Sequence, residues 1–169
     1  TGNQNTALGN STLVKNTTGS CNTAVGTLAL YANTTATGNV AVGACALKEN
    51  TTGVRNVAVG QNSMKLSTTA SDSVMIGTTA GDAITTGTSN TGVGADVMSS
   101  TTTGDFNVAM GNSALGANTT ADNNTAIGFF SMLLNTTGTG NAAVGRDSLR
   151  CNTTGNNNSA LGKDALKLN

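Results

Sequence analysis

The chain has 169 residues, of which 9% are charged and 2% aromatic, and eight basic side chains balance eight acidic ones. A chain without net charge offers no general attraction to nucleic acid or to an anionic membrane, and no stretch approaches the ~20 apolar residues of a membrane span. Histidine is absent, which excludes Ser–His and Cys–His nucleophiles and removes the commonest metal ligand. We therefore expect no enzyme, no cofactor, no metal site, no nucleic-acid partner and no membrane insertion.

A glycine recurs at every seventeenth position along the whole chain, and the residues around it recur with it. Its positions are Gly9, Gly26, Gly43, Gly60, Gly77, Gly94, Gly111, Gly128, Gly145 and Gly162. No insertion or deletion interrupts the period, which is too short for two packed helices and a turn, since helical repeats need ~33 residues. Residues 1–169 therefore form one repeat domain.

Each repeat opens with the pattern N-[TV]-A-[VIL]-G, which alternates and carries β-branched residues, as short strands do. We expect two or three short strands with turns in each coil. This pattern places one of them at 5–9, 22–26, 39–43, 56–60, 73–77, 90–94, 107–111, 124–128, 141–145 and 158–162. Two apolar columns are expected to be buried. One precedes each glycine: Leu8, Val25, Val42, Val59, Ile76, Val93, Met110, Ile127, Val144 and Leu161. The other lies at the fourth position after it: Leu13, Leu30, Leu47, Met64, Gly81, Met98, Leu115, Met132, Leu149 and Leu166.

The sequence N-T-T-G closes each repeat and predicts a turn, because asparagine and glycine favour turns and glycine accepts positive φ. Its threonines form two columns, the first starting at Thr17 and the second at Thr1. Together these elements predict an all-β fold, a β-solenoid (parallel β-roll) of ten 17-residue coils. Coils stacked at ~4.8 Å would give a rod of roughly 50 Å.

Stacking places identical side chains above one another, and such ladders support stacked strands. The expected structural ladders are the glycines Gly26, Gly43 and Gly60, the amides Asn22, Asn39 and Asn56, and the hydroxyls Thr17, Thr34 and Thr51, each continued along the chain. We expect the asparagines to bond amide to amide and the threonines hydroxyl to hydroxyl. The fifth repeat departs from the consensus at Ser73, Met75, Gly81 and Ile84. A local bulge or a looser coil is expected there.

The strings Asn22-Thr-Ala-Val-Gly26, Asn39-Val-Ala-Val-Gly43 and Asn56-Val-Ala-Val-Gly60 resemble the head repeats of trimeric autotransporter adhesins. The full unit also resembles the N-T-A-V-G arrays of tail-fibre-like proteins of bacteria, phages and large viruses. The resemblance covers the whole chain. It implies a left-handed parallel β-roll, three chains around one axis, and a location outside the cell, on a cell surface or on a virion.

The sequon N-x-[ST] is abundant, and six copies lie in the N-T-T turn: Asn16, Asn33, Asn50, Asn118, Asn135 and Asn152. Three others are Asn10, Asn123 and Asn157. One interpretation is a glycan on each coil. The other is that asparagine and threonine are present as turn and ladder residues and make sequons by chance.

Three functions remain open. The leading hypothesis is a structural extracellular fibre or surface-display rod, because neither end carries an atypical capping repeat and open strand edges favour end-to-end contact with further copies. The second is an adhesin or tail-fibre shaft that binds host glycans or matrix, which a cluster of Tyr31, Phe129 or Phe130 on the surface would support. The third is ice binding through outward ranks of threonine. Consecutive strand residues point to opposite faces, so a Thr-Thr pair presents at most one outward rank, whereas Thr-x-Thr presents two. The Thr-Thr pairs of this chain therefore favour ice binding less.

Overall fold

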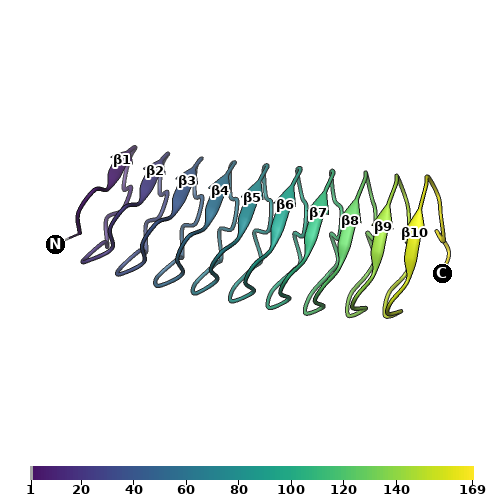
Figure 1. Cartoon of the computed structure of the whole chain (residues 1–169). Coiled ribbons are helices and arrows are strands. Elements are labelled where there is room, and N and C mark those ends of the chain that lie inside the picture. Colours follow the sequence, from purple (N-terminus) through teal and green to yellow (C-terminus); the bar gives the residue numbers. More distant parts are fainter. Residues whose placement is uncertain (1) are drawn as a thin grey trace.

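The computed structural model describes residues 2–169 and shows a straight rod in which the coils follow one another in chain order (Figure 1). Within these residues there is no helix, and ten parallel strands form one sheet. The strands are β1 (Thr6–Leu8), β2 (Thr23–Val25), β3 (Val40–Val42), β4 (Val57–Val59), β5 (Val74–Ile76), β6 (Thr91–Val93), β7 (Val108–Met110), β8 (Thr125–Ile127), β9 (Ala142–Val144) and β10 (Ser159–Leu161). The predicted β-solenoid is confirmed, while Thr1, the first residue of its threonine column, lies outside the described part.

Each strand pairs with the equivalent residues of the next coil, so that Ala24 lies beside Ala41 and Ala41 beside Ala58. The expectation of two or three strands per coil is wrong, because each coil within residues 2–169 contains one strand of three residues and turns sharply elsewhere. The flanking positions still extend the ladder, because the amide of Thr23 donates to the carbonyl of Asn39 and that of Gly43 to the carbonyl of Val25, both at 2.8 Å. The stack is therefore held in register along its whole described length.

The core is narrow and consists of small residues around one large apolar column. The central residue of each strand from β2 to β10 is buried and is alanine in all of them except β5 and β6. The second predicted column is buried from Leu30 to Leu149, whereas the prediction is wrong at the ends of the rod, where Leu13 is half-buried and Leu166 is exposed. The prediction for the residue before each glycine is wrong: Met110 is 45% exposed and Val144 37% exposed. Successive strand residues point to opposite faces, so an inward alanine turns both of its neighbours outward.

The first asparagine column, which precedes the strands, forms the expected amide ladder inside the rod. Asn56 is typical: its Nδ2 donates to Oδ1 of Asn39 at 3.2 Å and to the carbonyl of Ala70 at 2.7 Å. Its Oδ1 accepts the backbone N–H of Ser73 at 3.1 Å. One side chain thus satisfies buried backbone groups in its own turn and in the next coil.

The first threonine column is also a ladder, but the expected hydroxyl-to-hydroxyl bonding is wrong. The hydroxyl of Thr17 donates to the carbonyl of Thr34 at 2.9 Å, and the hydroxyl of Thr34 to the carbonyl of Thr51 at 3.1 Å. A carbonyl has two lone pairs and also accepts backbone N–H groups here, as Thr34 does from Thr17 and Thr18. The threonine side chain therefore adds a second tie between coils at the turn.

Three positions in each coil have a left-handed backbone conformation, although most of the residues there are not glycine. After β3 they are Cys45, Leu47 and Arg55, with φ of 60°, 49° and 57°. This conformation costs roughly 1–2 kcal/mol in a residue other than glycine. Each of the three amides donates to a carbonyl of a neighbouring coil at 2.9 to 3.1 Å, so contacts between coils hold the sharp corners.

The expected bulge or looser coil in the fifth repeat is wrong. Strands β4, β5 and β6 pair without interruption, and two substitutions compensate for two missing side chains. A Cβ on Gly81 would lie 2.8 Å from Cδ1 of Ile84, and one on Gly92 would lie 2.5 Å from Sδ of Met75. Ile84 and Met75 are fully buried and occupy the space that leucine and alanine fill elsewhere.

Candidate interaction surfaces

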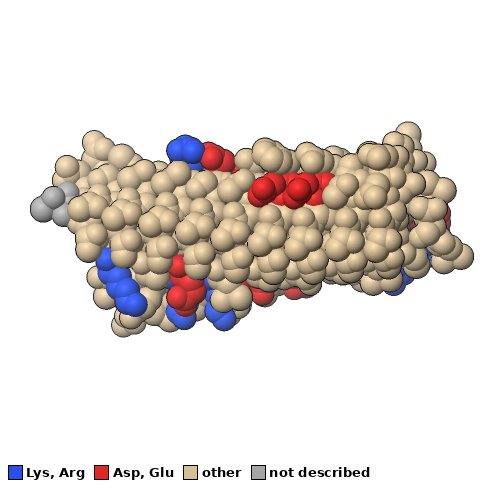
Figure 2. All heavy atoms as spheres, turned by 90° about the horizontal axis from the view of Figure 1, so that it is seen from below, with Lys and Arg blue, Asp and Glu red and all other residues tan. Residues whose placement is uncertain are grey.

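The described residues contain no pocket and no group of three or more Cys, Asp or Glu side chains able to hold a metal ion. No helix within 2–169 is long and apolar enough to cross a membrane. One side of the rod, drawn in Figure 2, is mostly uncharged, with a few separate acidic and basic groups. The candidate sites are therefore the outer faces of the coils.

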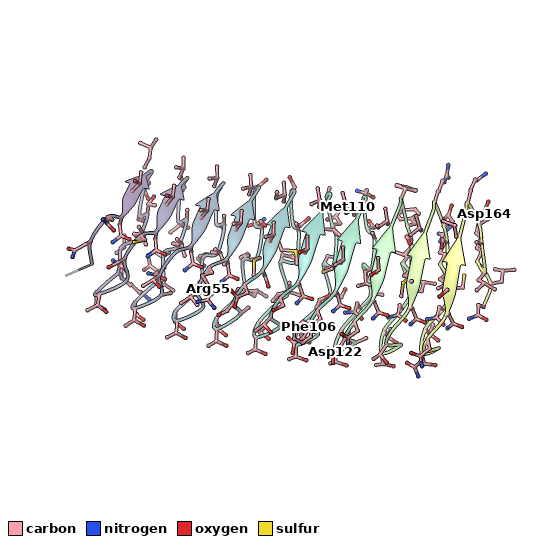
Figure 3. All side chains as sticks on the ribbon, in the orientation of Figure 1. Arg55, Phe106, Met110, Asp122 and Asp164 are labelled. Atoms are coloured by element: carbon pink, nitrogen blue, oxygen red, sulfur yellow. The ribbon has the colours of Figure 1, made fainter. Side chains whose placement is uncertain are left out.

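The strand face consists of the outward residues of β1–β10 and runs the full length of the rod. Its first column is Thr6, Thr23, Val40, Val57, Val74, Thr91, Val108, Thr125, Ala142 and Ser159. Its second column is the apolar series from Leu8 to Leu161 that was expected to be buried. None of these residues is charged, and Figure 3 places Met110 at the end of β7 on this face.

The threonine edge lies at the opposite end of the strands, along the N-T-T-G turns. Its exposed rank is the second threonine column, for example Thr35, Thr52 and Thr69, whereas the first column is mostly half-buried. The next outward rank, two positions later, includes Val54 and Asp105 and is chemically mixed. A single regular threonine rank does not favour ice binding.

Charged side chains near this edge act mainly as local partners between coils. Asp105 accepts the backbone N–H of Thr88 at 2.6 Å, and its own N–H donates to Asp122 at 2.7 Å. Arg55 pairs with Asp72 at 2.6 Å, and the hydrogen bond from Arg55 lowers the pKa of the Asp72 carboxyl. Figure 3 shows Arg55, Phe106 and Asp122 along this margin.

On another side of the rod, Asp82 is partly buried. Its Oδ1 is buried without a hydrogen-bond partner, and burial raises the pKa of this carboxyl. The carboxyl lies beside Asp96, which also raises its pKa, and near Lys65, which lowers it.

The six turn sequons lie in the wall of the rod. Asn33, Asn50, Asn118 and Asn135 have no exposed surface, Asn152 is nearly buried and Asn16 is half-buried. In all six, Nδ2 donates to the carbonyl at the third position after it. A glycan on that nitrogen would have to replace this bond and leave through the packed coil, which argues against attachment there. Asn10, Asn123 and Asn157 are exposed.

The Phe–Arg corner comprises Phe129, Phe130, Arg146, Asp147 and Arg150, on the turns that follow β8 and β9. The two phenyl rings lie 3.8 Å apart between centroids. The guanidinium of Arg146 lies 5.5 Å from the Phe129 ring, and that of Arg150 lies 5.1 Å from the Phe130 ring. Asp147 joins both arginines, at 3.1 Å each.

The sequence pattern indicates that Asp147 belongs to a solvated ion pair on a surface turn. This interpretation is wrong, because the residue is only 4% exposed.

The structure brings together two of the three aromatic residues named as a possible cluster, Phe129 and Phe130, while Tyr31 lies several coils away under Lys15. The three polar members of the corner were not predicted as a unit. The available signal was that Arg146 and Asp147 follow Phe129 and Phe130 by one repeat period, with Arg150 three residues after Asp147.

Searches of protein-family models, curated proteins and solved structures find no match to this chain. The fold nevertheless defines the class of the protein: the chain is a β-solenoid repeat protein, in which each coil of 17 residues pairs in parallel with the next. The candidate functional features are the strand face and the Phe–Arg corner.

Proposed function

We propose that this chain is a structural rod, a segment of an extracellular fibre or of a surface-display shaft on a cell or virion. The single observation that carries the proposal is the uninterrupted register from β1 to β10, with no pocket among residues 2–169. The side chains of this repeat are used mainly to join one coil to the next. A straight, self-supporting spacer is the function that such an arrangement serves best.

The proposed partner of the rod is itself. The strand face is a continuous uncharged surface with exposed Ile76, Met110 and Val144, and contiguous apolar patches on soluble proteins mark interaction sites. A second copy carries the same columns at the same spacing, so two or three rods can match along their whole length. The resemblance to trimeric adhesins, three chains around one axis, supports the same arrangement.

End-to-end contact is a second part of this proposal. The outer edges of β1 and β10 have no partner strand within residues 2–169, and Leu161 beside the last edge is 82% exposed. Open strand edges template pairing with another strand. Any N-linked glycans on this fibre belong at the exposed Asn10, Asn123 and Asn157.

Size-exclusion chromatography with light scattering tests lateral association. The wild-type chain is expected to have a mass two or three times that of one chain, 16.6 kDa, or larger where ends also join. The variant Ile76→Lys/Met110→Lys places two charges on the strand face and should give single chains. A monomeric wild type at micromolar concentrations would reject lateral association.

The matched control is Thr86→Lys/Thr120→Lys, which adds the same charges on the exposed threonine edge of the same two coils. The control should keep the wild-type mass, and both variants should keep the wild-type circular dichroism spectrum because all four side chains point outward. Equal dissociation of both variants would indicate general charge repulsion and contradict a role of the strand face.

A binding shaft is the second candidate function, and the Phe–Arg corner is the observation that favours it. Aromatic and arginine side chains are enriched in binding hot spots. In this chain they gather at one place that departs from an otherwise repetitive surface.

A further inference from the structure

The Phe–Arg corner continues into the next coil with the same arrangement of charges. Arg146, Asp147 and Arg150 occupy three positions of one turn, and Lys163, Asp164 and Lys167 occupy the equivalent positions one repeat later. Asp164 joins Lys167 at 2.9 Å and Lys163 at 3.6 Å. We call this second layer the lysine tier; Figure 3 places Asp164 beyond β10, at the margin of the rod where the strands end.

The two layers hold half of the basic residues of the chain. They contain four cations and two carboxylates, a local charge of +2, while the whole chain has a net charge of +0 and the rest therefore carries −2. The hydrogen bond from Lys167 lowers the pKa of the Asp164 carboxyl. The corner is the most cationic part of a nearly uncharged rod.

The arginines are held in place before any ligand arrives. Asp147 is buried and fixes Nε of Arg146 and one terminal nitrogen of Arg150, each at 3.1 Å. The rings of Phe129 and Phe130, tilted by 34° to each other, lie under the guanidinium groups of Arg146 and Arg150. Arg146 still has 62% of its side chain exposed, and a guanidinium has five N–H donors in a fixed fork. Ordered donors lose less entropy on binding an anion.

We propose that the Phe–Arg corner and the lysine tier bind an acidic polysaccharide through its carboxylate or sulfate groups. Arginine forks match the geometry of such oxyanions, and two layers of cations about one coil spacing apart, ~4.8 Å, suit a polymer with repeated charges. The surface there has no pocket within the described coils to enclose a small molecule. Exposed Asn112, one coil before Phe129, adds an amide for sugar hydroxyls.

A nucleic acid fits this surface less well. Single strands need free aromatic faces for base stacking, whereas the rings of Phe129 and Phe130 face each other and the two arginines. The two aspartates also weaken the field along a phosphate backbone. Nucleic-acid binding is therefore kept as an outcome of the test.

The test is isothermal titration calorimetry of the chain with heparin, which carries sulfates and carboxylates, and with polygalacturonate, which carries carboxylates alone. Binding of either polymer is expected at physiological salt, and the pair distinguishes sulfate from carboxylate recognition. Neutral dextran should give no heat. Arg146→Gln/Arg150→Gln should weaken binding about tenfold or more, because two charge-assisted contacts are lost.

Arg55→Gln is the matched control, since Arg55 is exposed, pairs with one aspartate and lies on the opposite margin of the rod. It should leave the affinity within about twofold of wild type. Arg146→Lys/Arg150→Lys keeps the charge and removes the fork, and should bind more weakly than wild type. All variants should keep the wild-type mass in light scattering, because the corner lies outside the strand face, so the rod proposal is tested separately.

Three results would overturn the proposal. They are no binding of either acidic polymer by the wild-type chain, an equal loss of affinity in Arg55→Gln, or binding of a single-stranded DNA oligonucleotide as tight as that of the polysaccharides. The first would leave the corner as a local stabilising network, and the other two would make it a general polyanion surface.

Discussion

Replacing Gly60 by alanine is expected to lower the free energy of unfolding by about 4 kcal/mol, from a strained backbone and an overfilled contact together. Gly60 has a φ of +134°, which favours glycine. A Cβ at this position would lie 2.3 Å from the carbonyl oxygen of Gly77 in the next coil. That oxygen belongs to the backbone, so it cannot move aside without opening the stack. Urea denaturation followed by circular dichroism measures the loss.

Two glycines in the same chain separate the causes. Gly162 has a similar φ of +118° but no atom within 4 Å of an added Cβ, so Gly162→Ala should show the backbone strain alone. Gly38 has a φ of +70°, its nearest contact would be 3.7 Å away, and other coils carry cysteine or arginine there. Gly38→Ala should cost only the roughly 1–2 kcal/mol of left-handed backbone. An equal loss in Gly60→Ala and Gly38→Ala would contradict the close contact between coils.

The second large effect is expected from Asn56→Ala, which should cost about 3–5 kcal/mol, since each buried polar group left without a partner costs about 1–3 kcal/mol. The substitution leaves the carbonyl of Ala70 without the bond from Nδ2, and the N–H of Ser73 without its acceptor. Both groups lie inside the rod, where water cannot replace the asparagine. Chemical denaturation of the two proteins gives the difference.

The chain supplies its own control for this residue. Ser73 occupies the same column, and its hydroxyl oxygen accepts the N–H of Asn90 at 3.1 Å. Asn56→Ser should therefore keep an acceptor for the next coil, lose the Nδ2 donor to Ala70 and Asn39, and cost less than Asn56→Ala. If serine and alanine were equally destabilising, the asparagine ladder would not be the tie between coils that its geometry indicates.

The sequence was sufficient for the fold because its period is strict. A glycine at every seventeenth position determines which residues pair, and the column of Leu30 and Leu47 is apolar in nearly every repeat. The burial of the strands was predicted less well. Val42 and Met110 are larger than the preceding Ala41 and Ala109, yet they point outward, and the buried strand position is filled by alanine except at β5 and β6. Met75 fits at this position in β5 because Gly81 and Gly92 leave space beside it.

Contacts that depend on neighbouring coils were also hidden from the sequence. Leu47 and Cys45 have positive φ, although neither residue type favours it, because bonds between coils enforce the corner. The hydroxyl of Thr34 donates to a carbonyl and not to another hydroxyl. A column of threonines in the sequence does not show which of these acceptors is used. The burial of Asp147, whose backbone N–H donates to the carbonyl of Phe129 one coil away, was hidden for the same reason.

Residues 2–169 form a straight rod in which each repeat adds one coil. Electron–electron distances between pairs of spin labels on exposed threonines measure this geometry, in the monomeric strand-face variant with Cys21, Cys45 and Cys151 replaced by serine. Thr35 labelled with Thr103, Thr137 or Thr154 spans four, six or seven coils. A straight stack should give distances that rise linearly, at ~19, ~29 and ~34 Å, from a coil spacing of ~4.8 Å. Distances that fail to rise with the number of coils would rule out a straight stack.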